Sequence, residues 1–157
     1  MKCGGSGVWL AREIAKAIDP LGTTVNEYGE NVTWWGQTLS SEYNHRLSCE
    51  LGQAAGHRVM GIFPWTPALE VSFSAYKAAF QELQGRGPSV QDLRVRDLEE
   101  YSDDQLFFMT HCYPLCSKEG SQQEWNVPLR HFYLFADAFG CPLGSPMSAN
   151  SKCTFFN

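Results

Sequence analysis

A run of aromatic and aliphatic residues at helical spacing constrains the fold of this chain more than any other feature. The run lies between residues 66 and 88, and its members recur every three or four positions: Leu69, Phe73, Tyr76, Phe80 and Leu83. This period places side chains on one face of an α-helix. Thr66 and Pro67 are typical of a helix start, and the glycines and proline of residues 85–88 are typical of a stop. The pattern predicts a long amphipathic helix.

The same spacing predicts two helices before it. The first extends from Val8 to Asp19, stops at Pro20 and is expected to be mostly buried. The second is capped by Thr33. Its buried stripe is expected to consist of residues four apart, which are Leu39, Tyr43, Leu47 and Leu51.

Glycine and proline mark the connections. Residues 23–31 are predicted to be a loop or a weak strand pair around Gly29, and residues 52–67 a loop.

The C-terminal third contains a capping box. Ser102-Asp103-Asp104-Gln105 precedes an apolar run, which predicts a helix that Pro114 limits. The polar residues 117–126 are expected to be exposed. A last short helix is predicted over residues 132–139, with His131 at its start, followed by an irregular tail over residues 141–157.

Composition fits one mostly helical, all-α domain over residues 1–157, because 43% of the residues are hydrophobic and no repeat or linker divides the chain. The net charge of −5 and the scattered basic residues exclude a nucleic-acid footprint. The sequence contains no window of 18 apolar residues, so it predicts no membrane span.

Cysteines and a sequon indicate the secretory pathway. The chain has an even number of cysteines: Cys3, Cys49, Cys112, Cys116, Cys141 and Cys153. Six cysteines permit about 15 complete pairings, and the sequence alone selects none of them. Asn31-Val32-Thr33 is an N-glycosylation sequon, so we expect a disulfide-bonded glycoprotein.

The C-terminal segment has a distinctive order of residues. In residues 135–147 an aromatic-bounded helical run leads into Cys141 and then Gly144-Ser145-Pro146-Met147, and Lys152-Cys153 follows near the end. This order resembles the end of the neprilysin and endothelin-converting-enzyme family of zinc metallopeptidases, although Phe155-Phe156-Asn157 replaces the family's closing tryptophan.

Segments further upstream are similar to the same family in the same order. They are Val32-Thr33-Trp34-Trp35-Gly36-Gln37 before Cys49, which matches a paired-tryptophan helix, Ala75-Tyr76-Lys77-Ala78, and Gln105-Leu106-Phe107-Phe108 with Cys116. The resemblance implies the C-terminal, zinc-site part of the large domain of such a peptidase.

The resemblance also implies that the zinc site has degenerated. Such peptidases use an H-E-x-x-H helix, whose histidines bind zinc and whose glutamate is the general base. Residues 12–16 align with it, so Arg12 and Lys16 replace the histidines and only Glu13, at the general-base position, is retained. The family's glutamate ligand falls on Pro64, and its supporting aspartate falls on Ala68.

Electrostatics makes zinc binding at these positions unfavourable. A cation about 5 Å from a divalent ion costs about 7 kcal/mol at an effective dielectric constant of about 20. We therefore expect no cofactor, although zinc is the family's metal. The family's substrate-binding histidine and arginine fall near Lys118 and Glu124, and a glutamate there would repel an oxyanion.

The resemblance implies a disulfide between Cys49 and Cys153. Closing a loop of about 100 residues stabilises a fold by roughly 4.7 kcal/mol in the chain-entropy model. The family partners of Cys116 and Cys141 lie outside this sequence, so these residues pair with each other, pair with Cys3 or Cys112, or remain thiols.

Three other interpretations use the same residues. His111, Cys112 and Cys116 have ligand chemistry suited to a second zinc site. Cys112 beside His111 suggests a cysteine hydrolase, although adjacent helical residues point about 100° apart. Exposed tryptophans are typical anchors for a partner, and the candidates are Trp34, Trp35, Trp65 and Trp125.

The hypothesis that follows is a catalytically inactive neprilysin-like domain with a structural, peptide-binding or decoy role, whose partners are peptides or a protein. The alternative is a fragment or variant of an active zinc metalloendopeptidase. The resemblance implies an extracellular or membrane-attached ectodomain.

Overall fold

Helices dominate the computed structural model, which describes residues 2–52, 61–85, 95–116 and 122–156. Within these ranges the only pairing of extended backbone is an isolated antiparallel bridge between Val25 and Asn31, so the all-α prediction is confirmed. None of the described helices is long and apolar enough to cross a membrane. The α-helices are α1 (Val8–Ala15), α2 (Gln37–Leu51), α4 (Trp65–Gln84), α5 (Asp103–Cys112), α6 (Gln122–His131) and α7 (Tyr133–Phe139). The short turns are π-helical at Cys3–Gly7 (η1) and 3₁₀ at Lys16–Ile18 (η2), Gly22–Thr24 (η3) and Tyr113–Leu115 (η5).

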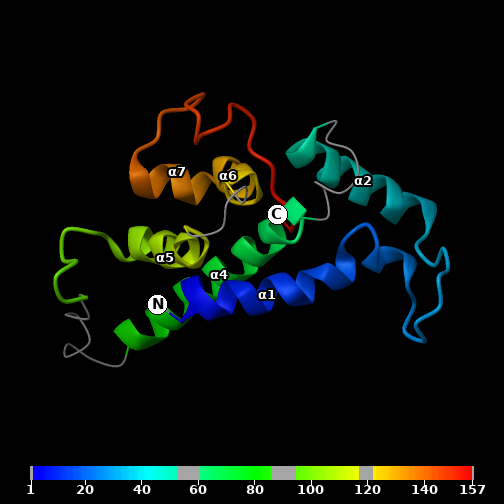
Figure 1. Cartoon of the computed structure of the whole chain (residues 1–157), viewed down its shortest axis with the longest axis horizontal. Helices are drawn as coiled ribbons and strands as arrows, with labels where there is room; N and C mark the ends of the chain where they lie inside the picture. The colour runs from blue at the N-terminus through cyan, green and yellow to red at the C-terminus, as the bar shows by residue number, and fades with distance from the viewer. Residues whose placement is uncertain (1, 53–60, 86–94, 117–121, 157) are drawn as a thin grey trace.

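Helix α4 is the central element, with α1 packed along it and α5, α6 and α7 on the other side (Figure 1). The η1 turn that precedes α1 lies against α5. A Cβ atom at Gly4 would lie 2.4 Å from the carbonyl oxygen of Phe107. Only glycine permits this approach, which fixes the N-terminal end of α1 against the core.

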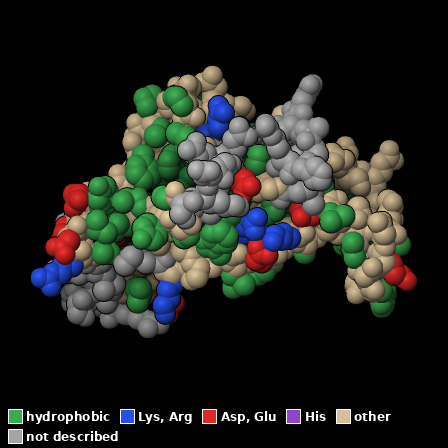
Figure 2. Space-filling model, viewed as in Figure 1, with side chains coloured by type: hydrophobic (Ala, Val, Ile, Leu, Met, Phe, Trp, Pro, Cys, Tyr) green, Lys and Arg blue, Asp and Glu red, His purple; other side chains and the backbone are tan. Residues whose placement is uncertain are grey.

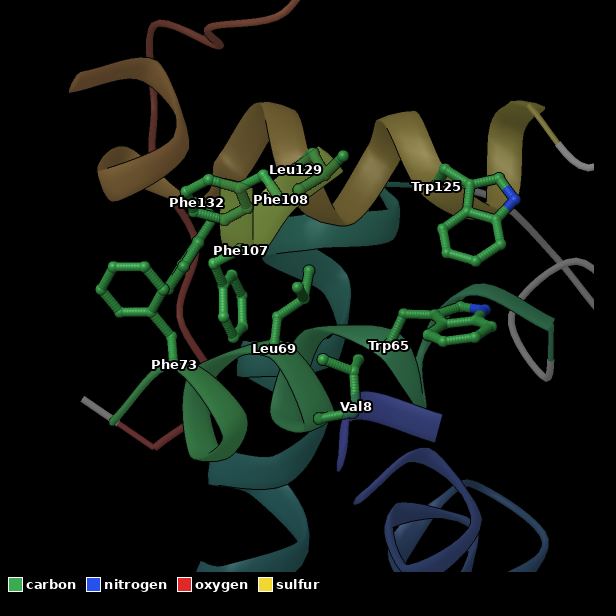
Figure 3. Close-up of a cluster of buried hydrophobic side chains, with 10 residues drawn as sticks. Val8, Trp65, Leu69, Phe73, Phe107, Phe108, Trp125, Leu129 and Phe132 are labelled. Carbon is green, nitrogen blue, oxygen red and sulfur yellow. The ribbon is translucent and has the colours of Figure 1, made fainter. Parts of the chain in front are cut away.

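The main core lies where α1, α4, α5 and α6 meet (Figure 3). It consists of Val8, Trp65, Ala68, Leu69, Phe73, Phe107, Phe108, Trp125, Leu129 and Phe132. A second cluster of Tyr43, Ile62 and Phe63 joins α2 to the start of α4, and Phe155 from the tail packs against it. The two clusters hold both ends of the chain on α4.

Helix α1 confirms the first predicted helix in position but not in burial. The α-helix ends at Ala15, and η2 continues it to Ile18. Leu10 and Ile14 are each 65% exposed, so the expectation that this helix is mostly buried is wrong. Only its inner face, which includes Val8, lies on α4, and the opposite face points away from the core.

Helix α2 begins at Gln37, four residues after the predicted cap at Thr33. Gly36 is the N-cap and has extended backbone, with ψ of 156°. The predicted paired-tryptophan helix is therefore wrong for Trp34 and Trp35, which precede the helix. Tyr43 is buried as predicted, but Leu39 is 53% exposed.

Helix α4 confirms the long amphipathic helix and its end at Gly85. It begins at Trp65 after Pro64, so the predicted N-cap at Thr66 is wrong: Thr66 lies inside the first turn. In the predicted loop, residues 53–60 lie outside the described ranges, while Ile62 and Phe63 are buried.

The capping box before α5 is confirmed, with Ser102 Oγ accepting from the Gln105 N–H at 3.2 Å. The polar segment that follows differs from the prediction. Residues 117–121 are not described, but α6 begins at Gln122, and its Trp125 is 5% exposed, so an exposed stretch to residue 126 is wrong. His131 ends α6 and does not start α7, because Phe132 has extended backbone.

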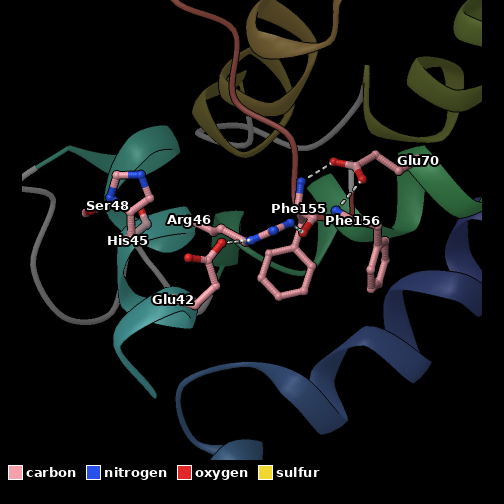
Figure 4. A network of polar contacts seen from close by, with 7 residues as sticks. All are labelled: Glu42, His45, Arg46, Ser48, Glu70, Phe155 and Phe156. Atoms are coloured by element: carbon pink, nitrogen blue, oxygen red, sulfur yellow. Dashed lines mark hydrogen bonds and ion pairs between the residues drawn. The ribbon is translucent and has the colours of Figure 1, made fainter. Parts of the chain in front are cut away.

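The C-terminal tail is irregular as predicted, and its last residues are tied to α2 and α4. Cys49 and Cys153 form the predicted disulfide, with an S–S distance of 2.03 Å. Buried Glu70 accepts from the backbone N–H of Phe155 at 2.5 Å through Oε1 and of Phe156 at 2.8 Å through Oε2. Arg46 Nη1 donates to the Phe155 carbonyl at 2.5 Å (Figure 4). We call Arg46, Glu70, Phe155 and Phe156 the tail clamp.

Candidate functional site

The three charged residues of the predicted degenerate motif lie together on α1 and η2. Glu13 Oε1 is 2.6 Å from Arg12 Nη1, and Glu13 Oε2 is 2.5 Å from Lys16 Nζ. Hydrogen bonding from Lys16 is the largest cause that lowers the pKa of Glu13. Both carboxylate oxygens of Glu13, the residue at the predicted general-base position, are thus held by cations. Figure 2 shows basic and acidic side chains side by side in the middle of this face.

Arg12 also contacts the start of α4. Its guanidinium carbon lies 4.5 Å from the centroid of the Trp65 ring, a cation–π contact. The Arg12 side chain is only 17% exposed, and its Nε is buried with no hydrogen-bond partner within the described ranges. Trp65 follows Pro64 directly, so the fold brings the Arg12 position to the turn of α4 that carries the predicted third-ligand position.

Pro64 and Ala68 are both buried on that turn. Neither side chain has an oxygen, nitrogen or sulfur atom to offer a metal. Over the residues that the structure describes, His, Cys, Asp and Glu side chains form no group of three or more that could hold a metal ion. Zinc does not fit the set of donors at residues 12, 16 and 64, because two are cations and one has no ligand atom.

Four aromatic rings fill the space next to Arg12. We call this cluster the aromatic box, and its members are Trp9, Trp65, His111 and Trp125. The rings of Trp65 and Trp125 are 4.5 Å apart, and His111 lies 5.5 Å from Trp65 and 4.9 Å from Trp125. Trp9 closes the box at 5.1 Å from Trp65.

The aromatic box contains buried nitrogen atoms that have no hydrogen-bond partner among the residues that the structure describes. They are Nε1 of Trp65, Nε1 of Trp125 and both ring nitrogens of His111. Figure 3 shows the two indole nitrogens on the same side of the tryptophan pair. Each unsatisfied buried polar group costs about 1–3 kcal/mol. The box is therefore well packed but poorly satisfied in hydrogen bonding.

His111 is the titratable member of the aromatic box, and its side chain is fully buried, at 0% exposure. Burial lowers its pKa to about 4, so the ring is neutral at pH 7. The second zinc hypothesis placed this ring beside Cys112 and Cys116, but it contacts Trp65 and Trp125. The structure instead supports a packing role for His111.

The cysteine chemistry does not support a nucleophile. Burial, followed by the proximity of Cys116, raises the pKa of Cys112 to about 11, so the thiol is protonated at neutral pH. The Cys116 thiol donates a hydrogen bond to the Cys112 carbonyl oxygen, which lies 3.7 Å from its Sγ. Cys3, Cys112, Cys116 and Cys141 are free thiols in the structure.

The two predicted substrate-binding positions have different outcomes. Lys118 lies outside the described residues. Glu124 lies in the first turn of α6, where a Cβ on Gly61 would be 3.4 Å from its Oε1. The carboxylate thus faces the segment that leads into α4.

Three buried side chains differ from what the sequence predicts or have no prediction: His111, Glu70 and Trp125. The neighbouring cysteines suggest ligand chemistry for His111, and no local pattern indicates that Glu70 is buried. For Trp125 a signal exists, because the spacing of Trp125, Leu129 and Phe132 at i, i+4 and i+7 predicts a buried helical face.

Sequence comparisons support the resemblance to the neprilysin and endothelin-converting-enzyme family. The chain is 25% identical to Neprilysin-1 of Caenorhabditis elegans over 178 aligned positions, covering 96% of this chain and 23% of the relative. It is also 25% identical to Neprilysin-1 of Trittame loki, with coverage of 96% and 24%. The endothelin-converting enzyme homolog of Locusta migratoria is 25% identical, with coverage of 98% and 24%.

The chain therefore spans about a quarter of the length of the curated relatives it matches. No family model matches the sequence. No solved structure matches it either.

Proposed function

We propose that this chain is a neprilysin-like domain that binds no catalytic zinc and does not hydrolyse peptides, and that its role is structural, peptide-binding or that of a decoy. One observation carries the proposal. The positions that align with the family's zinc ligands hold Arg12, Lys16 and Pro64, and both cations are paired with Glu13. A zinc ion there would meet two positive charges and no ligand.

The contacts of Arg12 support a structural role for this position in place of metal binding. Its guanidinium lies over Trp65 and reaches Glu13, so the cation has its own structural role between α1 and α4.

A binding role is supported by the outer face of α1. Leu10 and Ile14 are one helical turn apart and 65% exposed, so they present adjacent apolar side chains to a partner. We place the protein in an extracellular or membrane-attached setting, because the Cys49–Cys153 disulfide persists in oxidising compartments.

The first test is the zinc content of untagged protein, purified without chelator and measured by plasma mass spectrometry. We expect near-zero zinc, unchanged in Glu13→Ala, and no hydrolysis of a quenched fluorescent peptide in added zinc. One zinc per chain with peptide hydrolysis would instead support a variant or fragment of an active metalloendopeptidase.

A gain-of-function variant tests the assignment of positions. Arg12→His, Lys16→His and Pro64→Glu together replace the substituted ligands, and we expect this variant to bind zinc. The matched control combines the two histidines with Pro64→Ala, which supplies one ligand fewer, and should bind zinc more weakly. Equal zinc binding by both variants would show that residue 64 is not the third-ligand position.

A further inference from the structure

A hollow of about 240 Å³ lies at the end of the molecule away from α5, between the segment of residues 20–35 and α2. Its walls include the exposed Trp34, the half-buried Trp35 and the hydroxyl and amide side chains of Thr33, Ser40 and Asn44. The hollow shares no residue with the aromatic box.

The lining has the chemistry of a site for an uncharged polyhydroxy ligand. None of the described residues that line the hollow is charged, so an ionic ligand would have no counter-charge there. Hydroxyl and amide groups both donate and accept, as sugar hydroxyls do. Thr23 and Thr24 use their hydroxyls on the carbonyls of Pro20 and Leu21.

The other polar side chains of the lining are available. Asn31, Thr33, Ser40 and Asn44 make no side-chain hydrogen bond within the described ranges.

Trp34 forms an aromatic platform at the edge of this hollow. It is 56% exposed and is held edge-to-face by Trp35 at 5.7 Å. Trp35 is in turn packed on buried Tyr43 at 5.2 Å, and the Tyr43 hydroxyl donates to the Ile18 carbonyl at 2.9 Å. The C–H face of a pyranose ring packs on the electron-rich face of such an indole. The platform is thus rigid and remains exposed.

The N-glycosylation sequon lies at this hollow. All three residues of Asn31-Val32-Thr33 line it. Asn31 is exposed and ends a tight turn that Asn26 Oδ1 organises by accepting from the N–H groups of Tyr28 at 3.0 Å and Glu30 at 2.9 Å. A hollow of this size fits about one sugar ring and would bind a free sugar weakly. A sugar attached to Asn31 has an effective concentration in the millimolar range.

We propose that Asn31 carries an N-linked glycan whose first N-acetylhexosamine packs on Trp34 and occupies this hollow. Attachment forms a bond from Asn31 Nδ2 to C1 of the sugar and breaks the bond from C1 to a lipid diphosphate. The diphosphate leaves with the electron pair, and the amide loses one proton. The ring then lies over Trp34 within reach of Thr33, Ser40 and Asn44.

The test uses the full chain secreted from animal cells, with glycans trimmed enzymatically to one N-acetylglucosamine. Mass spectrometry of peptides reports occupancy of Asn31, and NMR reports the N-acetyl methyl proton of the attached sugar. We expect an occupied site and an upfield-shifted methyl signal, which returns to its solution position in Trp34→Ala. Tyr28→Ala is the matched control, because Tyr28 is exposed but lies outside the hollow.

Thermal unfolding supplies a second readout through a double-mutant cycle. Asn31→Gln removes the glycan and should lower Tm by about 2 °C, the shift that a loss of about 1 kcal/mol gives in a chain of this size. Trp34→Ala should lower Tm in the glycosylated protein and not in Asn31→Gln. An unoccupied Asn31, or an occupied one with an unshifted methyl signal and additive Tm effects, would overturn the proposal.

Discussion

The aromatic box and the tail clamp both bury polar groups against helix α4, but these groups differ in their hydrogen bonding. In the clamp, each carboxylate oxygen of Glu70 accepts a backbone N–H, and Arg46 donates to the adjoining carbonyl. In the box, both nitrogens of His111 and the indole nitrogens of Trp65 and Trp125 are buried without hydrogen-bond partners in the described part of the chain. One region is satisfied in hydrogen bonding, and the other relies on packing alone.

The difference shows where the fold is specified. Hydrogen bonds that need exact geometry tie the tail to α2 and α4, so this end of the domain has one arrangement. The aromatic box lies next to Arg12, and among the described residues its rings pack without hydrogen bonds to these nitrogen atoms. Packing alone maintains this part of the core, at a cost of about 1–3 kcal/mol for each unsatisfied buried group.

The disulfide is expected to give the largest effect on the clamp side of this comparison. Replacing Cys49 and Cys153 by serine removes a cross-link between residues 104 positions apart. We expect a loss of about 4.7 kcal/mol in the free energy of unfolding, measured by urea titration. The control is Cys116→Ser, because this exposed cysteine forms no disulfide. Equal effects of the two changes would show that the cross-link adds nothing.

His111 is expected to give the next largest effect, through pH. Its pKa is about 4 in the folded state because of burial and about 6.5 when unfolded. The unfolded chain binds more protons in this window, so stability is complete above pH 6.5 and falls by about 3 kcal/mol as the pH drops to 4. His111→Phe should abolish this contribution and stabilise the fold at all pH values.

Urea titrations between pH 4 and 7 measure this contribution, and the exposed His45 on α2 supplies the control variant His45→Phe. A pH profile that His111→Phe leaves unchanged would contradict the idea that the box contains an unsatisfied imidazole.

The contribution of Glu70 to stability should depend on pH in the opposite direction to that of His111. Glu70→Ala leaves the N–H groups of Phe155 and Phe156 without their acceptors, and we expect a loss of about 2 kcal/mol. Burial is the largest cause that raises the pKa of Glu70, so the folded state keeps its proton to higher pH than the unfolded state. This contribution to stability is complete below the ordinary pKa and falls as pH rises through the raised value.

Glu70→Gln separates the hydrogen bonds of the clamp from its charge. It keeps one acceptor and removes the pH dependence, so its stability profile should be flatter than that of the native chain. If Glu70→Ala and Glu70→Gln have the same free energy of unfolding in urea titrations between pH 4 and 7, the tail clamp contributes little to stability.

Local patterns in the sequence predicted much of the fold. The capping box of Ser102 and Gln105 and the long helix that ends at Gly85 follow from short-range rules, and both are present. The Cys49–Cys153 disulfide followed from the family resemblance and not from spacing.

Long-range contacts explain the features that the sequence did not predict. A glutamate is ordinarily a surface residue, and the burial of Glu70 depends on backbone groups about 85 positions away. His111 beside two cysteines suggests a ligand set, and only the tertiary packing of Trp65 and Trp125 shows it as a core residue. The sequence predicts Thr33 as the N-cap of α2, but the N-cap is Gly36. The packing of Trp35 on Tyr43 keeps residues 33–36 outside the helix.

The smallest effect is expected at the charged edge of the box, and it separates packing from ion pairing. Lys16 and Glu13 are 43% and 54% exposed, so Lys16→Ala should change stability by less than about 0.5 kcal/mol. Arg12 is mostly covered and lies over Trp65, so Arg12→Ala should cost about 1 kcal/mol. Raising the salt concentration to about 1 M should remove the Lys16 effect and retain most of the Arg12 effect. If both effects vanish in salt, Arg12 acts as a surface charge, and the site has not been rebuilt around its contact with Trp65.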